Sequence, residues 1–133
     1  MLENAGLIRL LMRDELSLKN MDKADKIYLE NTNLMCLNRP EIGNLRETFF
    51  VNQLENVGKI YFSKSGDFRV GEFVFEIDGA KKSFNQIKDN TNSFVVADNL
   101  EIGFGSKIPL WPFELMYWFI NFNETIICMY KKW

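Results

Sequence analysis

The sequence feature that most constrains the fold is a pair of short strand-like runs, residues 67–70 and 73–77, separated only by Gly71 and Glu72. A Gly-X pair between two such runs is typical of a β-hairpin with a type II′ turn. A two-residue loop also determines the register, because residues equidistant from the loop face each other across the ladder. The expected cross-strand pairs, counted outward from the turn, are Val70 with Phe73, Arg69 with Val74, Phe68 with Phe75, and Asp67 with Glu76.

The outermost expected pair places two carboxylates, Asp67 and Glu76, directly opposite each other on one face of a sheet. Like charges in this position destabilise a sheet. A bound divalent cation is one explanation, since Mg²⁺ typically takes one or two carboxylates together with substrate phosphates. The alternatives are that both acids face solvent, or that the strands pair in a different register.

The clearest helix is expected over residues 44–57. Asn44 can cap it, Glu47 lies three residues later as in a capping box, and Gly58 suits the exit. At about 100° per residue, Glu47 also falls on the apolar face of this helix. The apolar residues in that sector are Phe50, Val51, Leu54 and Val57. Buried carboxylates are rare without partners. Two interpretations of Glu47 therefore stay open, a capping residue or a partly buried functional acid.

The remaining pattern alternates between helical and strand-like segments. Helices or helical turns are expected over residues 2–13, 34–37, 83–90 and 111–120, and strands over residues 26–29, 59–62, 94–97 and 100–104. Residues 14–25 are typical of a polar connector, and the aromatic, Lys-containing residues 121–133 receive no assignment. This alternation favours a mixed α/β or α+β layer fold.

The composition limits the chemistry that the chain can perform. It has 133 residues, which suits one domain, with no His and two Cys. Without His there is no Ser-His-Asp triad, Cys-His pair or His-ligated zinc site, and two Cys cannot form a Cys₄ site. Chemistry must therefore rest on carboxylates, Lys, Arg and hydroxyls, or on carboxylates with a hard metal ion.

Charge and hydropathy limit the partners. Sixteen Lys and Arg against 18 Asp and Glu give a net charge of −2, which disfavours a generally basic nucleic-acid coat and permits a local basic patch. The most apolar stretch, residues 108–122, is too short to span a bilayer and is broken by two prolines and a Glu. With no signal-peptide pattern at the start, we expect a cytoplasmic protein with no membrane partner.

Lysines follow the second hairpin strand. Lys81 and Lys82, together with Lys88, could contact phosphates or stabilise developing negative charge. The alternative is an ordinary solvated turn. Residues 103–107 (GFGSK) lack the GxxxxGK[ST] spacing, so we expect no nucleotide site there.

Four segments, in order, carry a family resemblance: KIYLENTNLMCLN, GNLRETFFVNQL, GDFRV with FEIDGAKKSFNQIK, and ADNLEIGFGSKIPLW. They resemble the carboxy-terminal region of a large group of bacterial and archaeal AAA-type ATPases, a domain of unknown function. That domain is similar to the PD-(D/E)xK fold, which implies an α/β (mixed α+β) architecture with a restriction-endonuclease-like core and a mixed central sheet flanked by helices. The resemblance implies a helical-linker remnant over residues 1–25, the nuclease-like domain over 26–120 and an atypical tail over 121–133.

The resemblance also implies a catalytic site. Glu47 matches the first-helix acid, Asp67 the strand acid and Glu76 the acid of (D/E)xK. In such a site these three acids would hold Mg²⁺ or Mn²⁺. Asp78 stands two residues after Glu76, where the motif has Lys; Lys81 or Lys82 could reach back as a substitute, and Lys82 is the one assigned to the catalytic set.

The chain has no Walker A loop, Walker B strand or arginine-finger context, so we expect no ATPase activity from it. The resemblance and the missing lysine together predict a noncatalytic nucleic-acid- or protein-binding module of an AAA-type ATPase, present without its ATPase domain. Its expected partners are DNA or a protein. The alternatives are a Mg²⁺-dependent nuclease using Glu47, Asp67 and Glu76, and a structural fragment that packs against the ATPase module or against itself as a homodimer.

Overall fold

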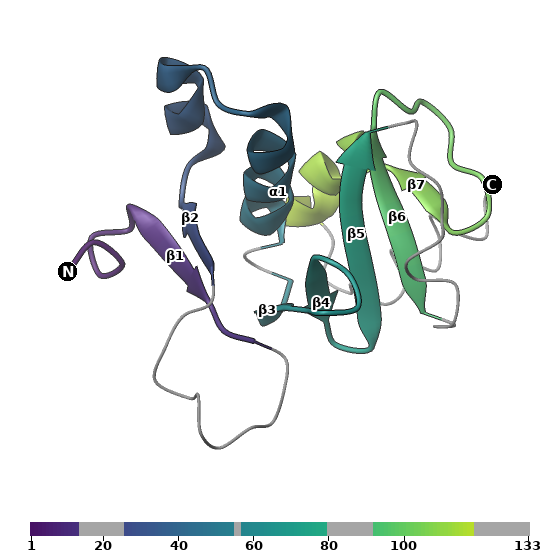
Figure 1. The fold of residues 1–133 in the computed structure, drawn as a ribbon, viewed down its shortest axis with the longest axis horizontal. Coiled ribbons are helices and arrows are strands. Elements are labelled where there is room, and N and C mark those ends of the chain that lie inside the picture. The colour runs from purple at the N-terminus through teal and green to yellow at the C-terminus, as the bar shows by residue number, and fades with distance from the viewer. Residues whose placement is uncertain (14–25, 55–56, 80–91, 119–133) are drawn as a thin grey trace.

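The structure, a computed structural model, describes residues 1–13, 26–54, 57–79 and 92–118. This part of the chain forms a mixed α+β fold with two sheets (Figure 1). The small sheet pairs β1 (Ile8–Leu11) with β2 (Lys26–Leu29) in antiparallel orientation. A 3₁₀ helix, η1 (Thr32–Asn38), leads into the long helix α1 (Ile42–Gln53). No helix in these described ranges is long and apolar enough to cross a membrane.

The large sheet contains five strands in the order β3-β4-β5-β6-β7. Their bounds are β3 Ile60–Phe62, β4 Phe68–Val70, β5 Phe73–Gly79, β6 Ser93–Asp98 and β7 Lys107–Pro109. The pairs β3–β4 and β4–β5 are antiparallel, whereas β5–β6 and β6–β7 are parallel. The expected mixed sheet is therefore present, followed by a final 3₁₀ helix, η3 (Trp111–Trp118).

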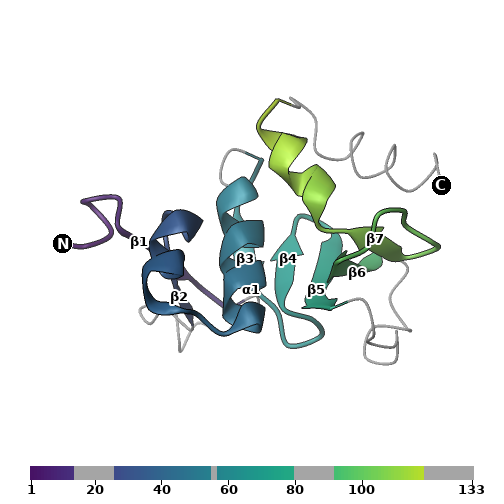
Figure 2. The same ribbon diagram turned by 90° about the horizontal axis from the view of Figure 1, so that it is seen from above.

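The core lies between α1 and one face of the large sheet. Seen from two directions, α1 stands between the small β1–β2 sheet and the five-stranded sheet (Figures 1 and 2). Phe50 of α1 is fully buried and contacts Phe68 of β4, Phe75 of β5 and Phe113 of η3, with ring centroids 4.9–5.5 Å apart. Because side chains alternate between the two faces of a strand, Val74 and Val95 lie apart from this core and form a separate buried cluster.

The hairpin prediction is confirmed for its first three pairs and wrong for the fourth. Val70 pairs with Phe73, Arg69 with Val74 and Phe68 with Phe75, and Gly71 takes the positive φ of +59° that the tight turn requires. Asp67 then leaves the ladder instead of facing Glu76. Its amide donates to the carbonyl of Phe75 (2.8 Å), one residue out of register.

Gly66 accounts for this departure from the ladder. A Cβ at position 66 would lie 2.8 Å from Cγ1 of Val74 and 3.0 Å from the carbonyl oxygen of Phe75. The chain before β4 therefore passes closer to β5 than a residue with a side chain could.

Several predicted elements differ from the observed ones. The helix expected over residues 2–13 is wrong, because Ile8–Leu11 is a strand whose ladder with β2 is a long-range contact that local apolar spacing does not encode. The strand expected over residues 100–104 is also wrong, since only Phe104 makes an isolated bridge, to Lys107, and the strand is β7.

Other elements are close to their predicted positions. The 3₁₀ helices η1 and η3 match the helical segments expected near residues 34–37 and 111–120, and the side chain of Asn31 caps η1 by accepting from the amide of Asn33 (2.9 Å). The connector over residues 14–25, the helix over 83–90, the residues Lys81, Lys82 and Lys88, and the tail over 121–133 lie outside the described residues.

Candidate functional site

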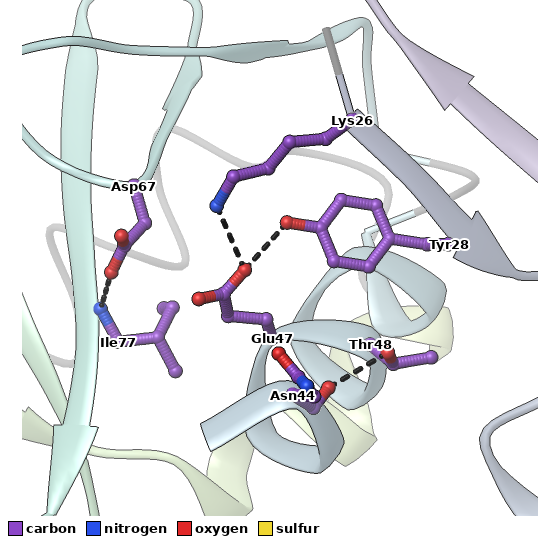
Figure 3. A network of polar contacts seen from close by, with 7 residues as sticks. All are labelled: Lys26, Tyr28, Asn44, Glu47, Thr48, Asp67 and Ile77. Carbon is purple, nitrogen blue, oxygen red and sulfur yellow. Dashed lines mark hydrogen bonds and ion pairs between the residues drawn. The ribbon is translucent and has the colours of Figure 1, made fainter. Parts of the chain in front are cut away.

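Glu47 lies near the middle of α1, where its carboxylate meets two donors from β2 (Figure 3). Its Oε2 accepts a hydrogen bond from the hydroxyl of Tyr28 (2.6 Å) and one from Nζ of Lys26 (3.0 Å). The capping-box interpretation of Glu47 is wrong, because α1 begins two residues before Asn44, with Glu41 at the N-cap position. Asn44 is inside the helix, where its carbonyl accepts from the hydroxyl of Thr48 (2.8 Å).

Strand alternation explains why Lys26 and Tyr28 reach the same acid. They are two residues apart on β2, so both side chains leave the strand on one face, whereas Ile27 between them is 64% exposed on the other. The ring of Tyr28 packs against Phe68 in the core. The ammonium of Lys26 lies 4.8 Å from the ring centroid of Phe62, a cation–π contact that helps to hold it beside Glu47.

Tyr28 is a hydrogen-bond donor over the whole physiological pH range. Burial raises the pKa of its hydroxyl far above the ordinary value, and the hydrogen bond to Glu47 and the negative charge of Glu47 raise it further. A neutral phenol that donates to a carboxylate forms a charge-assisted hydrogen bond, which is short and strong. Tyr28 is therefore a permanent donor to the Glu47 carboxylate.

Asp67 approaches the Lys26 ammonium from the side away from Tyr28 (Figure 3). Its Oδ2 accepts a hydrogen bond from the amide of Ile77 (2.7 Å). The carboxylate therefore bonds to β5 at the point where the backbone of the chain before β4 has left the ladder. Burial raises the pKa of Asp67, the Ile77 amide opposes that shift, and the nearby charges of Glu47 and Glu76 add to it. The positive charge of Lys26, which contacts Glu47 directly, lowers the pKa of Asp67.

Glu76 lies on a different face of the sheet from the helix that carries Glu47. It is only 3% exposed and occupies the centre of β5, in register with Val95. Its neighbours Phe75 and Ile77 point into the main core that contains Phe50 of α1, so strand alternation directs Glu76 to the opposite face. Asp78, two residues later, shares that opposite face with Glu76 by the same alternation.

The structure thus brings Glu47 and Asp67 together around Lys26 and leaves Glu76 across the sheet. Within the described ranges, no group of three or more His, Cys, Asp or Glu side chains is placed to hold a metal ion. One oxygen of each acid is already engaged, because Oε2 of Glu47 accepts from Lys26 and Tyr28, and Oδ2 of Asp67 accepts from the Ile77 amide. This donor set does not fit an Mg²⁺ or Mn²⁺ held jointly by all three acids.

Sequence reasoning missed Lys26 and Tyr28. The signal was present, because Lys26 and Tyr28 alternate with apolar residues in the KIYL strand and so had to share a face. The sequence alone did not predict that β2 packs beside α1. Comparisons with protein-family models, with curated proteins and with solved structures found no match to this chain.

Proposed function

We propose that this chain is a noncatalytic nucleic-acid-binding module with a restriction-endonuclease-like fold, corresponding to the C-terminal domain of a bacterial AAA-type ATPase. The observation that carries the noncatalytic part is the contact between Glu47 and the Lys26 ammonium, with Nζ 3.0 Å from Oε2. The lysine here supplies the positive charge that a divalent ion would otherwise bring.

The mixed sheet with α1 on one face and acids around the β4–β5 hairpin supports the nuclease-like assignment. The departure of Asp67 from the ladder and the position of Glu76 across the sheet support the loss of catalysis. Nucleic acid is favoured over a protein partner by the cations on or beside β1, β3 and β4, which stand out from a chain of net charge −2. Two of these cations, Lys59 and Arg69, lie beside the aromatic ring of Tyr61.

Two measurements on the intact chain test this proposal. Fluorescence anisotropy with labelled duplex and single-stranded DNA should show binding that strengthens as salt falls, because phosphate contacts release counterions. The same preparations, incubated with DNA or RNA and either Mg²⁺ or Mn²⁺, should show no cleavage. Absence of binding even at low salt would refute nucleic-acid binding and favour a structural fragment.

The competing hypothesis is a Mg²⁺-dependent nuclease. One observation favours it, since Lys26 supplies a lysine beside two acids in a chain whose motif lysine is replaced by Asp78. Metal-dependent cleavage that is lost in both Glu47→Gln and Lys26→Met, and retained in the exposed-residue control Glu41→Gln, would establish it. Cleavage that survives both substitutions would indicate a contaminating enzyme.

A further inference from the structure

We infer that the face of β3 and β4 around Tyr61 binds single-stranded nucleic acid, with Tyr61 as a stacking surface for a base and with Lys59 and Arg69 contacting the flanking phosphates. This inference rests on the proposed nucleic-acid-binding function and assigns it a site. The site shares no residue with the polar network of Lys26, Tyr28, Glu47 and Asp67.

Tyr61 is held beside two cations by the strand geometry. It faces Arg69 across the β3–β4 ladder, between the pairs Ile60–Val70 and Phe62–Phe68. Phe68 and Val70 are buried in the main core, so Tyr61 and Arg69 point to the opposite face. Nζ of Lys59 lies 5.3 Å and Cζ of Arg69 lies 5.9 Å from the centroid of the Tyr61 ring.

A hollow of about 200 Å³ adjoins this ring. It is lined by Arg9, Leu10, Leu11 and Met12 on one side and by Gly58, Lys59, Ile60 and Tyr61 on the other. The amide of Phe62 donates to the carbonyl of Met12 (2.9 Å), which joins the two walls. Drug-sized ligands need about 300–1,000 Å³. The size of the hollow therefore suits one planar ring inserted from the surface and not a larger molecule.

Basic residues gather along β1, β3 and β4. Lys59, Lys64 and Arg69 lie within residues 57–70, where the one acid is Asp67, and Arg9 and Arg13 lie on or next to β1. Arg9 forms an ion pair with Glu30, with Nε 3.0 Å from Oε2, and Asp67 directs its carboxylate to the amide of Ile77. The cations therefore outnumber the acids along β1, β3 and β4, although the whole chain is acidic and Glu76 lies on the same face of the neighbouring strand β5.

The form of the surface favours a single strand over a duplex. Sequence-tolerant binding of single strands combines a basic track with aromatic rings on which unpaired bases stack. Bases in a duplex are stacked on each other and cannot cover Tyr61. Readers of the duplex major groove usually insert a helix or a two-stranded ribbon, whereas this surface is one face of a five-stranded sheet with a hollow beside Tyr61.

Anisotropy titrations of the intact chain with fluorescein-labelled oligo-dT, and with a duplex of the same length, test the site. Tyr61→Ala should weaken oligo-dT binding by about 5- to 150-fold, the effect of losing one stacked base. Tyr61→Phe, which keeps the ring, should stay within about twofold of the unsubstituted chain. Lys59→Ala should make the log–log salt dependence less steep by about 0.7, the value for one lost phosphate contact to a single strand.

Matched controls come from the opposite edge of the same sheet. Phe104 is 86% exposed next to β7, so Phe104→Ala removes an exposed ring of similar size, and Lys107→Ala removes a cation on β7. Both controls should leave oligo-dT binding unchanged. Circular dichroism melts check that each variant is folded. Should Tyr61→Ala not fold, the exposed substitution Lys59→Glu provides the decisive loss of binding instead.

The outcomes separate the site from the function. If no DNA binds even at low salt, the proposed function fails and this inference fails with it. If oligo-dT binds and neither Tyr61→Ala nor the Lys59 substitutions change its affinity, the inference is overturned while nucleic-acid binding at another surface stands. Stronger binding of the duplex than of oligo-dT would also overturn the single-strand assignment.

Discussion

Replacing Glu47 with Gln distinguishes a structural carboxylate from a metal ligand by the sign of the stability change. The substitution keeps an oxygen that can accept from Tyr28 and removes the charge that faces Lys26 (3.0 Å). A hydrogen bond to a charged group contributes about 1.5–3 kcal/mol. The side chains of Lys26 and Glu47 are 30% and 21% exposed, so solvent screens part of this contribution. We therefore expect the free energy of unfolding to fall by about 1 kcal/mol.

A metal-binding carboxylate would behave in the opposite way. Acids gathered for a cation repel each other when no cation is bound, and Asp67 lies close enough to Glu47 for its pKa to be raised by that charge. Neutralising Glu47 would then stabilise the metal-free protein. We predict destabilisation, because the contacts from Lys26 and Tyr28 are direct and Asp67 has its own partner in the Ile77 amide.

Urea denaturation followed by circular dichroism, with EDTA present, is the appropriate assay. A change of about 1 kcal/mol shifts the midpoint temperature of a domain of this size by about 3–5 °C, so a thermal melt provides an independent check. Glu41→Gln is the matched control, since Glu41 is exposed and its side chain makes no capping hydrogen bond. It should change stability by less than about 0.5 kcal/mol. A Glu47→Gln variant as stable as the unsubstituted chain, or more stable, would show that Glu47 is not held by these contacts.

Phe50, Gly66 and Asp67 each allow a further test. Phe50→Ala should lower the free energy of unfolding by about 3–5 kcal/mol in urea titrations, because Phe50 is fully buried among aromatic rings; a loss below about 1 kcal/mol would contradict this packing. Gly66→Ala should destabilise the fold, since the added Cβ would lie 2.8 Å from Cγ1 of Val74. Gly43→Ala is the control and should be neutral or slightly stabilising, because the space around Gly43 is open. Equal melting temperatures for the two variants would count against the described hairpin. Asp67→Asn should stabilise the protein at neutral pH, because the folded pKa of Asp67 lies above its ordinary value of 3.8 and ionisation of this group therefore opposes folding. The extra stability of Asp67→Asn should shrink as the pH falls through the raised pKa of Asp67, and it should vanish below pH 3.8. Urea titrations at several pH values measure this difference, and a difference that grows on acidification would contradict the prediction.

The hairpin shows what local sequence determines well. A two-residue turn starting with Gly71 determined three cross-strand pairs, because turn geometry and side-chain alternation act over a few residues. The error at Asp67 came from a non-local cause. Gly66 lets the chain approach β5 closely, and the register then shifts at the residue that carries the chemistry.

The candidate site was predictable only in part, because its partners come from different elements. The helical pattern correctly marked Glu47 as an acid on the buried side of α1. Its partners Lys26 and Tyr28 are about 20 residues away along the chain and reach it through packing of β2 beside α1. Likewise, Ile8–Leu11 has the local spacing of a helix and becomes a strand only because β2 pairs with it. Such choices depend on tertiary contacts, which override local propensity.

A crystal structure from crystals soaked in Mn²⁺ decides whether these acids stabilise the fold or bind a catalytic metal. Anomalous difference maps, from data recorded near the manganese edge, would show a bound ion directly. We predict no anomalous peak beside Glu47, Asp67 or Glu76, and Nζ of Lys26 within hydrogen-bond distance of the Glu47 carboxylate. A manganese peak bridging Glu47 and Asp67, with Lys26 displaced from Glu47, would contradict the structural role and establish a metal site.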